Sequence, residues 1–305
     1  MAAFLFKRLV HGVIVLWVVA TLTFILLRLA PGGPFDRERR LPPEVLQNIE
    51  AKYHLNESWI SQYLRYLHGL IRGDLGPSYK YLDRDVNEII ADTLPASATL
   101  GGLALLFALS VSLAAGLTAA CYRDSWLDRG AMFLATIGIS LPHFILGALL
   151  IWAVALQLGW LQAGRWDQWS SAILPTITLG AAPAAYLAAL LRSSLIETLG
   201  EDFIRTARAK GLGEITVVFK HALRHSLIPT LTVMGPLTAA LLTGSFVVEY
   251  VFAIPGMGRF FITAVTDRDY PLIMGVTLVY TAILVSANLI VDLLYTTVDP
   301  RIRTT

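Results

Sequence analysis

Long runs of apolar residues separated by short polar stretches dominate the chain. A run of about 18 or more apolar residues is long enough to cross a hydrocarbon layer of about 30 Å as a helix. The first run follows Lys7 and Arg8 and covers residues 9–27. The further runs cover residues 96–120, 130–158, 174–191, 227–252 and 272–298. The pattern predicts an all-α polytopic membrane protein with six transmembrane helices.

The segment between the first two runs, residues 31–95, has the mixed polar and apolar pattern of a small helical subdomain. Pro42 and Pro43 can begin one helix, and apolar residues spaced three and four apart between Ile60 and Ile71 predict a second. Glycine and proline in residues 73–78 predict a turn. A third helix is expected to end near Pro95, before the second span begins.

The distribution of lysine and arginine predicts the orientation in the membrane. With the N-terminus inside, the inner side carries twelve of these residues, whereas the short outer loops carry Arg165, Arg259 and Arg268. The predicted divisions are 1–30 (cytoplasmic end and first span), 31–95 (extracytoplasmic insertion), 96–298 (five-helix core containing a cytoplasmic loop at 193–226) and 299–305 (cytoplasmic tail). Both termini are therefore expected in the cytoplasm.

Composition supports a membrane protein and excludes several kinds of site. The 305 residues are 55% hydrophobic and 15% charged, against about 25% charged in soluble domains. The net charge of +2 gives no case for nucleic-acid binding. Cys121 has no second cysteine to pair with, and the six histidines show no metal-ligand spacing. We expect no metal site and no catalytic residue, and no P-loop motif is present.

The polar segment 203–229 (FIRTARAKGLGEITVVFKHALRHSLIP) lies between two apolar runs. Gly211 and Gly213 bracket one leucine, which predicts a helix, a sharp turn and a second helix. The following apolar residues are expected to share one buried helical side: Ile204, Ala207, Leu212, Ile215, Phe219 and Ala222. A bent element of this kind suits contact with another protein, while a basic helix lying on anionic lipid is the alternative.

A few polar or helix-breaking residues within or beside the spans are candidates for a pathway or gate. They are Pro142, His143, Glu249, Pro255, Gly256 and Gly258. The simpler interpretations are a packed neutral histidine, a solvated helix end for Glu249 and Asp292, and a plain turn at residues 255–258. Few ionisable residues lie deep in the spans, which argues against an ion-coupled secondary transporter.

Several motifs resemble the membrane subunits of bacterial ABC importers. Arg-Thr-Ala-Arg-Ala-Lys-Gly at 205–211 is similar to their E-A-A loop, although Arg205 replaces the acidic residue and Arg224 stands where proline is usual. The stretches RLAPGGPF, PPEVLQNIEAKYHL, GDLGPSYKY, the IPGMG turn and the ending VDPRI resemble the dipeptide and oligopeptide branch. The similarity is greatest to the B-type permease subunit of that branch.

The resemblance implies a type I ABC importer permease fold and a set of partners. These are a second permease subunit forming a heterodimer, two ATP-binding subunits that bind ATP and Mg, an extracytoplasmic peptide-binding protein and a peptide substrate. It implies a bacterial inner-membrane location and no cofactor in this chain. The residues implied to contact the ATPases are Arg205, Thr206, Ala207, Arg208, Ala209, Lys210, Gly211 and Leu212. An ion-coupled secondary transporter of small solutes remains the alternative.

Overall fold

The computed structural model describes residues 2–35 and 42–298, and helices account for most of them. The predicted tail at 299–305 lies outside the described residues. The elements are α1 (Ala2–Leu29), α2 (Pro43–Lys52), α3 (Trp59–Ile71), α4 (Val86–Cys121), α5 (Trp126–Ser140), α6 (His143–Leu150), α7 (Ile173–Leu199), α8 (Asp202–Ala209), α9 (Glu214–Thr216), α10 (Leu223–Leu242), α11 (Phe246–Val251), α12 (Met257–Asp267) and α13 (Tyr270–Val298). Shorter turns are the π-helical η2 (Ile151–Gln157) and η4 (Val217–Ala222) and the 3-10 helix η3 (Trp169–Ala172).

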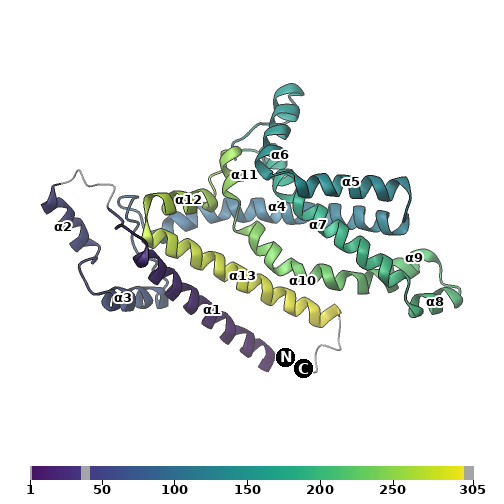
Figure 1. Ribbon diagram of the computed structural model, residues 1–305, viewed down its shortest axis with the longest axis horizontal. Helices are drawn as coiled ribbons and strands as arrows, with labels where there is room; N and C mark the ends of the chain where they lie inside the picture. The colour runs from purple at the N-terminus through teal and green to yellow at the C-terminus, as the bar shows by residue number, and fades with distance from the viewer. Residues whose placement is uncertain (1, 36–41, 299–305) are drawn as a thin grey trace. The chain divides into compact units, whose positions relative to one another are not determined.

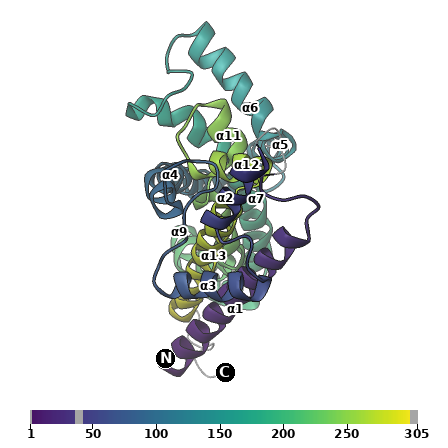
Figure 2. The same cartoon turned by 90° about the vertical axis from the view of Figure 1, so that its left-hand side faces the viewer.

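The all-α fold predicted from the sequence is confirmed, and one span differs from its prediction. In the described part of the chain, five helices are long and apolar enough to cross a membrane, and a bent pair supplies a sixth crossing if it counts as one span. That pair, Trp126–Ser140 and His143–Gln157, bends by 109°, and α6 is seen leaving α5 at this bend in both views (Figures 1 and 2). The bend has a local cause, because Leu141 precedes Pro142 and adopts an extended conformation.

One other helix boundary was predicted wrongly. The helix expected to end near Pro95 continues, since α4 runs through Pro95 to Cys121. Its first turns are held by packing, because Val86 and Ile89 are fully buried. The run at 227–252 lies almost wholly within one candidate span, Glu214–Val251. Within that span α10 ends at Leu242 and α11 begins at Phe246, and Gly244 between them has a φ of +84°.

The chain forms two compact units. The first comprises Met1–Ala96 with Gly256–Ile283. Its core joins the beginning of α4 to α12 and the beginning of α13 through Val86, Ile89, Met257, Leu272 and Val276. The second cluster of this unit surrounds Phe24, Tyr270 and Met274 and includes three further tyrosines.

The second unit comprises Ser97–Pro255 with Leu284–Thr305, and α7 is its central helix. It packs against α5, α6 and α10. Glycines allow the backbones to approach closely: a Cβ at Gly101 would lie 2.1 Å from the Leu241 carbonyl oxygen, and one at Gly180 would lie 2.8 Å from that of Ala104. Small residues of this kind are a common means of packing helices in membranes.

A partly buried ion pair joins α5 to α7. Arg192 donates from Nε and Nη2 to the two carboxylate oxygens of Asp128, each at 2.6 Å. Asp128 Oδ2 also accepts the Asp124 N–H at 2.9 Å. The sequence pattern identified Arg192 only as an inner-side charge and gave no signal for its partner, which lies 64 positions away.

Candidate functional site

The predicted helix, turn and helix of the 203–229 segment are confirmed. α8 ends at Ala209, and Gly211 follows with a φ of +82°. The Gly211 N–H donates to the Arg208 carbonyl oxygen at 2.9 Å, and the Leu212 N–H donates to that of Ala207 at 3.3 Å. A glycine fits this left-handed position at the end of a helix because it has no Cβ. The chain then continues through α9 and η4 into α10.

The buried side of this segment differs from the predicted one. Ile204 and Ala207 of α8 pack with Val217 and Ala222 of η4, against Leu195 of α7. Leu212, Ile215 and Phe219 were expected on the same side, but they are 39%, 78% and 58% exposed. The prediction failed because it carried one helical period across the turn, whereas the turn and the π-helical η4 reset the direction of the side chains.

The exposed surface of the turn carries both apolar and basic side chains. Of the eight residues proposed for ATPase contact, 205–212, Ala207 is buried and the other seven are exposed. An open groove of about 480 Å³ lies beside the turn. Its walls include Leu117, Cys121 and Tyr122 at the end of α4, Leu199 of α7, and Ile215 and Phe219.

An ion pair closes the turn. Arg208 donates from Nε to Glu214 Oε1 at 2.8 Å and from Nη2 to Oε2 at 3.2 Å. The Glu214 carboxylate raises the pKa of Arg208 by this hydrogen bonding. Arg205 lies 3.4 Å from Asp202 within α8. The Arg208 charge therefore holds the two sides of the turn together, and Lys210 is exposed beside it.

Of the candidate gate residues, Glu249 departs most from the simpler interpretation. It lies on α11, is fully buried, and accepts the Ser97 hydroxyl at 2.7 Å on Oε1. The solvated helix end suggested by the sequence is therefore wrong for Glu249. The break at Gly244 separates α10 from α11, which carries Glu249.

The other candidate gate residues do not gather around Glu249 in one site. His143 begins α6, and its Nδ1–H donates to the Thr178 carbonyl oxygen of α7 at 3.1 Å. α6 also packs on α11, where a Cβ at Gly147 would lie 3.2 Å from the Phe252 ring. Pro142 is exposed. Pro255 belongs to the second unit, while Gly256 and Gly258 belong to the first and are buried there.

Metal ligands do not gather in the part of the chain that the structure describes. Within residues 2–35 and 42–298, no group of three histidine, cysteine, aspartate or glutamate side chains is placed to hold an ion.

Sequence comparison places the whole chain beside transport proteins. The profile of a family described as binding-protein-dependent transport system inner membrane component matches residues 112–304, and the profile of its N-terminal part matches residues 1–101. The oligopeptide transport system permease protein OppB of Haemophilus influenzae is 44% identical over 99% of this chain and 100% of its own length. The dipeptide transport system permease protein DppB of Bacillus subtilis is 45% identical over 99% of this chain and 98% of its own length.

Solved structures show a similar fold at low sequence identity. One is an inward-facing form of the MetNI methionine ABC transporter, with a TM-score of 0.54, 20% identity and coverage of 69% of this chain and 96% of that one. Another is an amino acid ABC transporter, with a TM-score of 0.53 and 16% identity. The match covers 68% of this chain and 93% of that one.

Proposed function

Since the chain belongs to the family of binding-protein-dependent transport system inner membrane components, we propose that it is the permease subunit of an ATP-driven importer of oligopeptides. One observation supports peptides as the substrate. The chain matches relatives named for oligopeptide and dipeptide transport over nearly the full length of each. The protein is a membrane-spanning permease of a bacterial ABC importer.

The complete transporter, in this proposal, contains a second permease subunit, two ATP-binding subunits and an extracytoplasmic peptide-binding protein. The two permeases form the translocation pathway between them. ATP and Mg bind to the partner ATPase subunits, and this chain performs no catalysis. Both of its termini face the cytoplasm, which accords with the lysine and arginine distribution.

The turn at Arg205–Leu212 is proposed to contact an ATPase subunit. Protein interfaces commonly combine a buried apolar centre with a polar rim. Leu212, Ile215 and Phe219 supply the apolar centre, since they are exposed although large and hydrophobic. Arg205 and Lys210 supply positive charge beside them.

Coupling requires that the ATPases hold the turn differently in their two states, because a ligand shifts a conformational equilibrium only by its differential affinity. The turn is fastened to α7 by the buried cluster of Ile204, Ala207, Val217 and Leu195. A displacement of α8 is therefore passed to a helix at the centre of the second unit. Pro142, His143, Glu249, Pro255, Gly256 and Gly258 are proposed pathway or gate positions.

The test of this function begins with the chain in its native membrane. A mild-detergent pull-down is expected to recover a second permease and ATPase subunits, with vanadate-sensitive ATP hydrolysis. The recovered complex, reconstituted in vesicles with the binding protein, is expected to take up a labelled tripeptide only when ATP is present. Recovery of the chain alone, or uptake driven by an ion gradient without ATP, would contradict the proposal.

The role of the turn is tested by Gly211→Asp. This change forces a side chain into a φ of +82° and adds a negative charge to the surface, so uptake is expected to be lost while membrane insertion and binding-protein docking remain. The matched control is Gly213→Asp, which adds the same charge at a φ of −67° in the N-cap position of α9, where aspartate is favoured. Normal uptake by Gly211→Asp would exclude the coupling role.

A further inference from the structure

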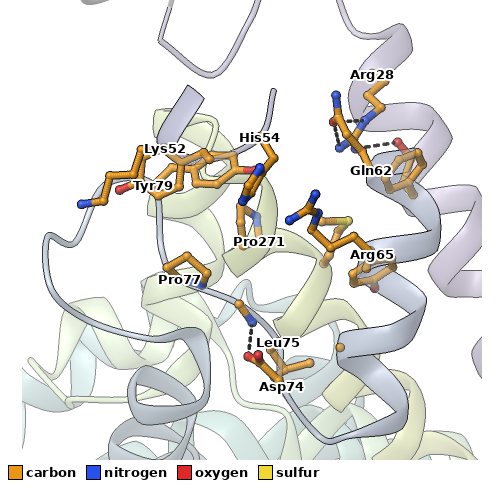
Figure 3. Close-up of a pocket in the computed structure, with 16 residues that line it drawn as sticks. Arg28, Lys52, His54, Gln62, Arg65, Asp74, Leu75, Pro77, Tyr79 and Pro271 are labelled. Atoms are coloured by element: carbon orange, nitrogen blue, oxygen red, sulfur yellow. Dashed lines mark hydrogen bonds between the residues drawn. The ribbon is translucent and has the colours of Figure 1, made fainter. Parts of the chain in front are cut away.

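The first unit contains a cavity of about 220 Å³ that the transport proposal does not use (Figure 3). Five segments form its walls: the end of α1, the end of α2, one side of α3, the loop at 74–79 and the beginning of α13. Its apolar and aromatic surface comes from Phe24, Tyr53, Tyr66, Tyr79, Pro271 and Met274. Ligand pockets typically combine such walls with a few placed polar groups.

The charged side chains that line the cavity are mainly cationic. Arg28, Lys52 and Arg65 line it, and Asp74 is the one carboxylate among its described lining residues. Asp74 Oδ1 accepts the Gly76 N–H at 2.8 Å and so is committed to the loop. Arg65 already has a counter-charge, because its Nη2 is paired with Glu57. Arg28 and Lys52 therefore outnumber the remaining carboxylate, Asp74, by one positive charge.

Arg28 is held in place by neutral groups. Its Nη2 and Nε donate to Gln62 Oε1 at 2.6 and 3.2 Å, and its guanidinium carbon lies 3.5 Å from the centre of the Phe24 ring. Gln62 is itself fixed, since its Nε2 donates to the carbonyl oxygens of Leu55 and Glu57 at 3.1 and 2.9 Å. In the described residues no carboxylate pairs with Arg28. A half-buried guanidinium without a counter-charge favours an incoming anion.

The tyrosine hydroxyls of the walls add no negative charge that would oppose an anion. Burial raises the pKa of Tyr79 to about 12, and burial also raises the pKa of Tyr66. Both phenols are therefore neutral at physiological pH.

We propose that this cavity binds the C-terminal residue of a peptide, with its carboxylate at Arg28 and its side chain against the aromatic walls. The volume is below roughly 300 Å³, the lower end of typical ligand pockets, so the cavity takes one terminal residue and not a whole peptide. The aromatic walls favour a large apolar terminal side chain. The choice of a peptide over another organic carboxylate rests on the proposed function.

The test uses the purified full-length chain in nanodiscs of zwitterionic lipid, without any binding protein. Equilibrium dialysis with labelled Ala-Ala-Phe is expected to show saturable binding, and the C-terminal amide of the same peptide is expected to bind at least tenfold more weakly. Arg28→Gln should weaken binding of the free acid at least tenfold. The control Arg72→Gln removes an exposed arginine of the same unit, outside the cavity, and should leave binding unchanged.

A second variant separates binding from folding. Lys52 is exposed, so Lys52→Gln is expected to keep the thermal stability of the chain while it reduces affinity about threefold through the lost charge. Equal binding of acid and amide, full binding by Arg28→Gln with retained structure, or absence of saturable binding would overturn the proposal. Displacement of the peptide by phosphatidylglycerol added to the nanodiscs would assign the cavity to an anionic lipid and overturn it as well.

The experiments distinguish a failure of the cavity proposal from a failure of the proposed transport function. ATP-dependent tripeptide uptake by the complete transporter, together with no binding to the isolated chain, would remove the cavity proposal and leave the function intact. Absence of ATP-dependent uptake of any peptide would remove the transport proposal.

Discussion

Two helix breaks in the second unit share a backbone conformation and differ in their surroundings. Gly211 and Gly244 have φ values of +82° and +84°, and each separates two helices. A Cβ at Gly211 would meet no atom within 4 Å, whereas one at Gly244 would lie 2.1 Å from Glu249 Oε1 and 2.9 Å from the Ser97 hydroxyl oxygen. The first glycine is required only by the backbone, and the second is required by the backbone and by packing. The open surroundings leave Gly211 exposed, while the filled surroundings of Gly244 hold the buried Glu249 in place.

The largest effect is expected from Gly244→Ala. The left-handed conformation costs roughly 1–2 kcal/mol for a residue with a Cβ, and overpacking a filled site adds about 1–3 kcal/mol. Glu249 has little freedom to move away, because it is fully buried and bonded to Ser97. Thermal unfolding of the purified chain is expected to show a large loss of stability. A loss no greater than that of Gly211→Ala would show that the two breaks are equivalent.

Glu249→Ala tests the contribution of the Glu249 side chain to the packing beside Gly244. It removes a buried hydrogen bond, a loss of about 0.5–1.5 kcal/mol, and the cavity left beside Ser97 adds to that loss. Glu249→Gln keeps the shape and an acceptor for the Ser97 hydroxyl, so its loss of thermal stability is expected to be smaller. Equal and negligible losses for both variants would contradict the importance of this contact.

Gly211→Ala measures the backbone requirement alone. With open space around the Cβ, the expected destabilisation is roughly 1–2 kcal/mol, confined to α8 and the turn. Amide hydrogen exchange is expected to increase in α8 and not in α7. Gly213→Ala, at a φ of −67°, is the control and should behave as the wild type.

The smallest effect on stability is expected from the Arg208–Glu214 pair. Exposed ion pairs contribute about 0.2–1 kcal/mol, so Arg208→Glu should barely change the thermal midpoint while it opens the turn by placing two carboxylates together. ATPase activity stimulated by peptide and binding protein is expected to fall, and the double variant Arg208→Glu with Glu214→Arg should recover it. Failure of the exchanged pair to recover activity would show that Arg208 acts by contacting a partner and not by closing the turn.

Sequence reasoning predicted the parts of this molecule that depend on neighbouring residues. The length of each apolar run predicted the spans, and the closely spaced Gly211 and Gly213 predicted the turn because glycines end helices. It failed where packing overrode a local rule, as at Pro95, which lies inside α4 because the preceding turns are buried. It also failed where one helical period was extended across a turn, so that Ile215 and Phe219 were assigned to the wrong side.

The sequence by itself therefore determined the class of protein, the number of apolar runs and the position of the turn at Gly211, since hydrophobic length and glycine conformation are local properties. Only the tertiary structure decided which side of α8 and η4 is buried, that Glu249 bonds Ser97 from 152 positions away, and that Arg28 is held by Gln62 beside a cavity. These contacts join distant segments, and no periodicity along the chain records which distant residue a side chain will meet.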